Sequence, residues 1–252
     1  MLDMTKDLRL AVLIDADNVP YANIKGILTE VARYGTPMIK RIYGDWTKPN
    51  LNGWKPVLLE HAITPVQQYG YTSGKNSTDS AMIIDAMDIL YGTSVDGFCI
   101  ISSDSDFTRL AIRIRESGKR VIGMGESKTP NPFIVACDKF IYIEVINKDE
   151  FKNSSISKGK FTGEIKDKLI KSLSEAIDDV ADEEGWAFLG DVGNHLIKNN
   201  PDFDSRNYGF MKLTYLIKAL KNVFDIDERK YPNNNTRHVY VRNKVNEASN
   251  KM

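Results

Sequence analysis

Short apolar segments alternate with helical segments along residues 8–146, and this alternation limits the possible folds more than any other feature. The first apolar segment, residues 9–14, is followed by a helical pattern that Pro20 opens. Further strand patterns lie at residues 36–43, 63–69, 98–106, 120–124 and 140–145. Strands that alternate with helices are typical of a parallel sheet covered on both faces. We therefore predict a three-layer α/β sandwich with a mostly parallel sheet.

The composition changes after residue 146, where Lys, Asn, Ser and Gly dominate residues 147–162 and predict a linker. An amphipathic helix is expected over residues 164–184, two shorter helices near 191–198 and 210–220, and a hairpin with a long polar tip over 223–242. Three helices and a hairpin in about 80 residues are typical of a winged helix-turn-helix domain. The predicted organisation is a first domain at 1–146, the linker, a second domain at 163–245 and a tail at 246–252.

The overall charge favours no class of partner, because 34 basic residues balance 34 acidic ones. The two cysteines, Cys99 and Cys137, are expected to be reduced core residues. The chain has no leader-like start and no apolar run approaching ~18 residues, so we expect a cytoplasmic protein without a membrane partner.

Acidic residues recur where predicted strands end or helices begin. Asp15 and Asn18 follow the first strand, Asp79 starts a helix on its apolar face, and Asp104 and Asp106 end the segment that begins at Phe98. The carboxyl ends of parallel strands meet at one edge of a sheet, where ligands bind. Clustered carboxylates repel one another, and a divalent cation compensates for that repulsion.

Carboxylate and amide oxygens without a nearby His or Cys favour Mg²⁺ or Mn²⁺ as the metal. We expect Asp15, Asp79 and Asp104 as direct ligands, with Asp106 acting through water or orienting another ligand. A single Asp after a strand is usually a helix cap or a turn residue, but the recurrence along one sheet favours a metal site. Such a metal lowers the pKa of bound water and neutralises charge on a phosphate, as phosphodiester hydrolysis requires.

Three motifs together resemble the NYN domain of the PIN-like nuclease superfamily, in its LabA-like branch, over about residues 8–146. These motifs are Leu13 to Asn18, Lys75 to Ser80, and Ser102 to Phe107. The resemblance implies a PIN-like, Rossmannoid version of the sandwich and a metal-dependent ribonuclease. It implies that Asp15, Asp79, Asp104 and Asp106 surround Mg²⁺ or Mn²⁺, and Asn18 matches the paired asparagine of the family.

The second half resembles another family, the OST-HTH domain, also called LOTUS, over about residues 163–243. The segments that carry this resemblance are Gly185 to Leu196, Pro201 to Asp204 and Tyr208 to Leu213. The resemblance implies a winged helix module associated with RNA regulation, with RNA or protein as its partner.

Basic residues near these motifs are candidates for RNA contacts. Lys75 precedes Asp79 in a polar loop, Arg109 and Arg113 are one helical turn apart, and Lys212 and Arg237 lie on the predicted helix and wing. Ordinary solvated surface explains the same residues.

The favoured hypothesis is a metal-dependent endoribonuclease whose second domain binds or selects RNA. A second hypothesis is a non-catalytic RNA-binding or adaptor protein with a structural metal site. A third is a phosphatase similar to the haloacid dehalogenase class, with Asp15 as nucleophile and Asp17 as acid/base, although Val19 replaces the hydroxylic residue usual in that class.

Overall fold

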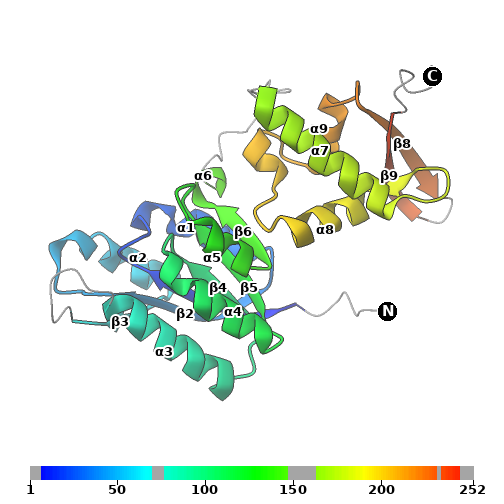
Figure 1. The fold of residues 1–252 in the computed structure, drawn as a ribbon. Coiled ribbons are helices and arrows are strands. Elements are labelled where there is room, and N and C mark those ends of the chain that lie inside the picture. Colours follow the sequence, from blue (N-terminus) through cyan, green and yellow to red (C-terminus); the bar gives the residue numbers. More distant parts are fainter. Residues whose placement is uncertain (1–6, 70–76, 147–162, 232–233, 245–252) are drawn as a thin grey trace. The chain divides into compact units, whose positions relative to one another are not determined.

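The structure is a computed structural model that describes residues 7–69, 77–146, 163–231 and 234–244 (Figure 1). The chain divides into two compact units, residues 1–150 and 151–252. The predicted linker at 147–162, the tail at 246–252 and Lys75 lie outside the described residues. Among the described helices, none is long and apolar enough to cross a membrane.

The first unit contains a sheet whose strands are all parallel, in the order β3-β2-β1-β4-β5-β6. The strands are β1 (Arg9–Asp15), β2 (Thr36–Gly44), β3 (Thr64–Gln67), β4 (Gly97–Ile101), β5 (Arg120–Gly125) and β6 (Lys139–Tyr142). The helices are α1 (Ile24–Val31), α2 (Trp54–His61), α3 (Ser77–Gly92), α4 (Thr108–Glu116), α5 (Asn131–Ala136) and α6 (Ile143–Ile146). The predicted mostly parallel sheet is confirmed.

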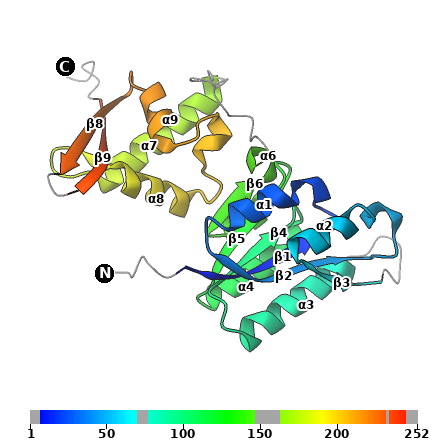
Figure 2. The same cartoon turned by 180° about the vertical axis from the view of Figure 1, so that it is seen from behind.

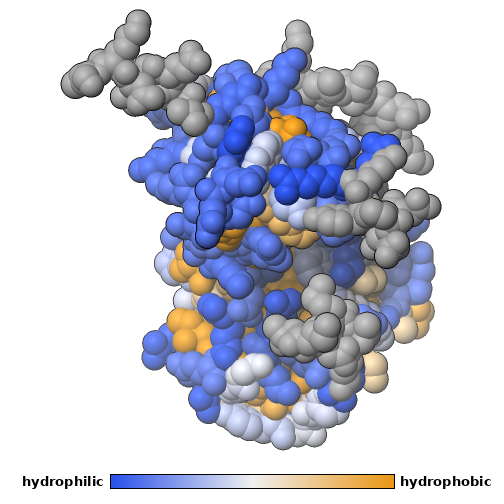
Figure 3. Space-filling view, turned by 90° about the vertical axis from the view of Figure 1, so that its right-hand side faces the viewer, coloured by the Kyte–Doolittle hydropathy of each residue, from blue (hydrophilic) through white to orange (hydrophobic). Residues whose placement is uncertain are grey.

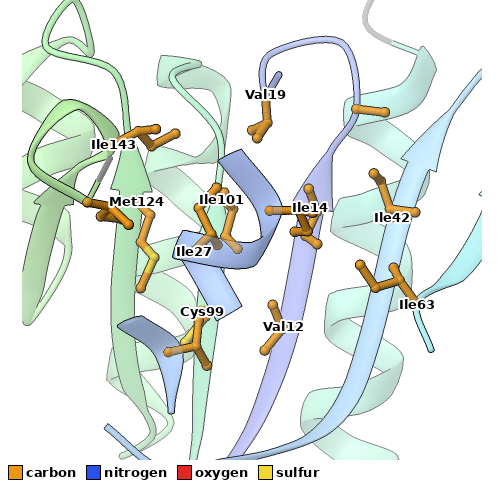
Figure 4. Packing of buried hydrophobic residues seen from close by; sticks show 14 of the residues in the cluster. Val12, Ile14, Val19, Ile27, Ile42, Ile63, Cys99, Ile101, Met124 and Ile143 are labelled. Carbon is orange, nitrogen blue, oxygen red and sulfur yellow. The ribbon is translucent and has the colours of Figure 1, made fainter. Parts of the chain in front are cut away.

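Both faces of this sheet are covered, because successive side chains of a strand point to opposite faces. Val12 and Ile14 of β1 pack in one apolar cluster with Ile27 of α1 (Figure 4). Ala11 and Leu13 pack in the other cluster, with the helices α3, α4 and α5. Figure 2 shows α1 and α2 on one side of the sheet and α3 and α4 on the other. The predicted three-layer sandwich is confirmed.

The direction in which the strands are added reverses at β1. From β1 the chain adds β2 and β3 on one side, and then returns to pair β4 with β1 on the other. Ile14 of β1 is opposite Ile101 of β4, so the two strands end side by side. Ligands of open parallel sheets bind at this switch point, beyond the carboxyl ends of the strands.

The second unit combines helices with an antiparallel sheet in the order β7-β9-β8, and the predicted small helical domain with a hairpin is confirmed. Its elements are α7 (Gly163–Val180), β7 (Ala187–Phe188), α8 (Leu189–Asn199), α9 (Leu213–Ala219), β8 (Phe224–Tyr231) and β9 (Asn234–Asn243). Leu173, Val192, Leu216 and Val241 are fully buried in its core.

The face of the molecule in Figure 3 is mostly hydrophilic, with apolar residues scattered over it.

Two boundaries in this unit differ from the sequence expectation. The first helix ends at Val180 rather than at residue 184, because the Asp182 carboxylate accepts the backbone N–H groups of Glu184 and Trp186 and forms a turn. Gly185 completes this turn with a φ of 79°. The hairpin strands extend to Tyr231 and Asn234, which pair with each other, so the predicted long polar tip is wrong.

Candidate metal centre

Three carboxylates from two separate parts of the chain meet at the switch point. Asp79 lies in the first turn of α3, and Asp104 and Asp106 follow β4. Each offers one oxygen atom, and the three oxygens lie within 4.8 Å of one another. Asp79 and Asp104 are partly buried and Asp106 is exposed, so the group is open to solvent on one side. Three carboxylate oxygens grouped in this way could hold a metal ion.

The turn after β4 holds two of these carboxylates in place. Asp104 caps the short 3-10 helix Ser105–Phe107, where its Oδ1 accepts the backbone N–H of Asp106 at 2.9 Å. The backbone N–H of Asp104 donates to Ser102 Oγ at 3.1 Å. Phe107 is fully buried and anchors the start of α4. Asp104 is therefore a helix cap and a member of the carboxylate group.

Asp15 lies beside this group as a buried, hydrogen-bonded carboxylate, 1% exposed. Its Oδ2 accepts from Asn18 Nδ2 at 2.6 Å and from Ser102 Oγ at 2.8 Å. Its Oδ1 accepts the backbone N–H of Asp17 at 3.1 Å. The mutual 4.8 Å grouping contains Asp106 rather than Asp15. Direct metal binding by Asp15 and Asn18 therefore stays a prediction.

The charges of these acids act on one another. Burial and, in decreasing order, the negative charges of Asp15, Asp104, Asp106 and Asp17 together raise the pKa of Asp79 to about 6. Burial also raises the pKa of Asp15, although the hydrogen bonds from Asn18 and Ser102 oppose this effect. A cation among these carboxylates relieves the repulsion that raises the pKa of Asp79.

The donor set fits a hard divalent cation. All three grouped ligand atoms are carboxylate oxygens, which suit Mg²⁺ or Mn²⁺ better than Zn²⁺. Asp79, Asp104 and Asp106 are the residues that would hold such an ion.

Two serines shape the site, and the sequence did not single them out. Ser102 is fully buried and links Asp15 to Asp104. Ser103 Oγ accepts the backbone N–H of Glu126 at 2.9 Å and ties the loop after β5 to the acidic turn. The available signal was a pair of hydroxyl side chains directly after an apolar strand.

The predicted RNA-binding residues lie in both units. Arg109 is exposed in the first turn of α4. Arg113, one turn further, donates to the hydroxyl of Tyr91 and lies 3.6 Å from a Glu116 oxygen. In the second unit, Lys212 is exposed at the start of α9. Arg237 is exposed on β9, with its Nη1 at 3.4 Å from Glu228 Oε2. Their role in binding RNA stays a prediction.

Among solved structures, three similar chains come from bacteria. A protein of unknown function from Vibrio parahaemolyticus is 19% identical, with a TM-score of 0.47 over 56% of this chain and 96% of that chain. An uncharacterized protein from Nitrosomonas europaea is 35% identical, with a TM-score of 0.29 over 38% and 85%. A protein from Chromobacterium violaceum is 30% identical, with a TM-score of 0.26 over 38% and 97%. No curated protein matches the chain.

Family models identify both halves of the chain. The NYN domain matches residues 9–144, more than half of the 252 residues, and the OST-HTH/LOTUS domain matches residues 162–236. Domains of both families are associated with RNA, and the NYN domain is part of a nuclease superfamily. Both resemblances inferred from the motifs are confirmed, and the two domains follow each other in the predicted order. The chain therefore belongs to the NYN domain family and carries an OST-HTH/LOTUS domain after its NYN domain.

Proposed function

We propose that this protein is a metal-dependent endoribonuclease of the cytoplasm, in which the OST-HTH/LOTUS domain binds the RNA that the NYN domain cleaves. The observation that carries the proposal is the group of three carboxylates at the switch point of a nuclease-superfamily domain. A binding module in the same chain supports RNA as the partner. A protein that binds the same module is a further proposed partner.

In this proposal, Asp79, Asp104 and Asp106 hold Mg²⁺ or Mn²⁺. When bound, the ion neutralises charge on the scissile phosphate and lowers the pKa of an attacking water. Asp15 accepts hydrogen bonds from Asn18 and Ser102, which hold its buried carboxylate in place. The negative charge of Asp15 helps to raise the pKa of Asp79. The exposed Arg109, three residues after Asp106, contacts a neighbouring phosphate of the strand.

The phosphatase hypothesis is weaker. A phosphate-accepting Asp15 must reach its substrate, but its side chain is nearly fully buried and both of its oxygens accept hydrogen bonds. The non-catalytic adaptor remains the second candidate, since the same carboxylates would hold a structural ion. Catalytic turnover of RNA would distinguish a nuclease from this adaptor.

A circular single-stranded RNA tests the proposal, because it has no ends and only an endonuclease opens it. We expect the full chain to linearise the circle with Mn²⁺ or Mg²⁺ and to stop when a chelator removes the ion. Asp104→Asn removes one charge from the group and should abolish the cut. Asp88→Asn changes an exposed carboxyl on the same α3 helix that carries Asp79, and should cut like the wild-type chain.

Two outcomes would contradict the proposal. Cleavage that persists in Asp104→Asn places the chemistry elsewhere or identifies a contaminating nuclease. RNA and metal binding without any cleavage supports the adaptor.

A further inference from the structure

A cavity opens beside the metal centre, on the α1 and α2 side of the sheet. Its volume is about 280 Å³, and Asp17 and Asn18 belong to its lining. We propose that this cavity binds a guanine base of the RNA strand and so sets the position of the cut. The proposal deepens the nuclease function and rests on it.

The cavity has the size and the composition of a site for one base. Ligand sites of about 300 Å³ are at the small end of the usual range. Four apolar residues of its lining are buried, namely Ala16, Val19, Leu51 and Trp54. Figure 4 shows Val19 beyond the end of β1. Most of the exposed surface of the lining is polar, so the cavity suits a flat ring with a hydrogen-bonding edge.

One wall is an exposed aromatic ring in a fixed position. Tyr21 lines the cavity and is 48% exposed. Its ring packs on the backbone of Gly53, because a Cβ at Gly53 would lie 2.5 Å from Tyr21 Cε1. Unpaired RNA bases stack on aromatic side chains of this kind.

The lining also carries a carboxylate beside an ammonium. Glu126 Oε2 and Lys128 Nζ are 2.5 Å apart. The Watson–Crick edge of guanine presents adjacent N1–H and N2–H donors next to the O6 acceptor. Of the four RNA bases, guanine alone can donate two hydrogen bonds from this edge to one carboxylate while its acceptor faces a neighbouring cation. Asn50, also in the lining, adds an amide with both donors and an acceptor.

This part of the lining is held in place and is continuous with the metal centre. The backbone N–H of Glu126 donates to Ser103 Oγ, directly before Asp104, and Thr129 Oγ1 donates to the Glu126 carbonyl at 2.6 Å. A Cβ at Gly125 would lie 2.6 Å from the Ser102 carbonyl oxygen, so the loop packs tightly on the acidic turn. Asn18, in the lining, donates to Asp15. A base in the cavity therefore brings an adjoining phosphate toward the carboxylates.

Binding of the four ribonucleoside 5′-monophosphates to the full chain tests the proposal without requiring cleavage. The titration is followed by NMR in the presence of a chelator, so that no metal contributes to binding. Because all four nucleotides carry the same phosphate, differences in affinity come from the base. We expect guanosine monophosphate to bind most tightly. Asn50→Phe fills the cavity and should weaken its binding roughly tenfold or more, and Tyr21→Ala, which removes the stacking ring, should also weaken it roughly tenfold.

The control Asn52→Phe places the same ring on an exposed residue of the same loop, outside the cavity lining, and should bind like the wild-type chain. Glu126→Gln should remove the preference for guanosine and leave the binding of adenosine monophosphate unchanged. Equal binding of all four nucleotides, no binding, or binding unaffected by Asn50→Phe would overturn the proposal. RNA cleavage without the guanosine preference would contradict only the base site. Guanosine binding without RNA cleavage would contradict only the nuclease function.

Discussion

At the scale of single residues, Asp79 carries the strongest electrostatic signature of the site. Its pKa of about 6 lies above the ordinary value of 3.8, so the metal-free folded chain holds a proton that the unfolded chain releases. The free energy of unfolding therefore falls as the pH rises between these two values, and the loss is complete at neutral pH. A bound cation offsets the part of this loss that comes from repulsion among the carboxylates.

The first prediction is that Asp79→Asn stabilises the metal-free chain at pH 7 by about 1–2 kcal/mol, allowing for the partly exposed position of this side chain. At about pH 3.5, where the carboxyl is protonated in both states, the gain should disappear. Urea unfolding with a chelator at both pH values measures it. Asp88→Asn serves as the control, and a gain of equal size in that variant would argue against the carboxylate repulsion.

Ser102 provides the second prediction, because its hydroxyl is the buried donor to Asp15. Ser102→Ala leaves that carboxylate with one donor fewer and should cost about 1–2 kcal/mol of unfolding free energy. Ser105→Ala, at an exposed position of the same turn, should cost almost nothing. Thermal unfolding of the two variants side by side checks the difference, and equal stability would mean that the bond contributes little.

The acids were predictable from the sequence, but the serine contacts were not. Asp15, Asp79 and Asp104 stand next to apolar periodic segments, and that position is visible in the sequence. The bond from Ser102 to Asp15 joins residues 87 positions apart, and only the pairing of β1 with β4 brings them together. For the same reason the sequence could not show that Asp106, which was expected to act through water, lies in the mutual carboxylate grouping and Asp15 does not.

At the scale of secondary-structure elements, α3 is fixed to the sheet by a polar contact behind the site. Asp85 of α3 accepts hydrogen bonds from Arg41 and Tyr43 of β2. Burial and the Asp85 carboxylate both raise the pKa of the Tyr43 hydroxyl, which stays protonated and donates. Asp79 lies six residues earlier on the same helix, so this contact helps to hold it against the turn after β4.

The third prediction follows from this contact. Tyr43→Phe removes one donor to Asp85 and should cost about 1–2 kcal/mol of unfolding free energy. Because α3 carries Asp79, Mn²⁺ should also bind several-fold more weakly, as calorimetric titration would show. Tyr215→Phe, at an exposed position in the second unit, should change neither quantity. Unchanged Mn²⁺ affinity in Tyr43→Phe would separate this contact from the metal centre.

Element types were predictable wherever apolar periodicity was strong, as in β1, β4 and α4. The ends of α7 and of the hairpin strands were not. α7 stops where the Asp182 side chain offers the backbone an alternative turn, and β8 and β9 continue through polar residues because cross-strand pairing compensates for weak strand propensity.

At the scale of the whole molecule, the two units have separate hydrophobic cores. Among the residues that the structure describes, the core cluster of the second unit consists of residues after 163. The two clusters of the first unit consist of residues before 147. Each unit is therefore expected to fold by itself. In the proposed function the first unit cuts and the second holds the RNA.

The fourth prediction separates these roles. A fragment of residues 1–150 should still cut a short RNA at saturating concentration at a rate close to that of the full chain. Its affinity for a long RNA should fall roughly 10–100-fold, because a linked second site raises the effective concentration. Gel-shift and single-turnover assays on the same RNA measure both quantities. An unchanged affinity would remove the second unit from RNA binding.

The central claim is that the carboxylate group binds the ion that makes RNA cleavage possible. Its most direct test is the cleavage rate of one labelled RNA as Mn²⁺ is titrated from zero, with Asp104→Asn and Asp88→Asn beside the full wild-type chain. The account predicts a saturating, metal-dependent rate for the wild type and Asp88→Asn, and a rate lower by roughly 1,000-fold or more for Asp104→Asn. Cleavage independent of Mn²⁺, or equal rates in all three proteins, would contradict it.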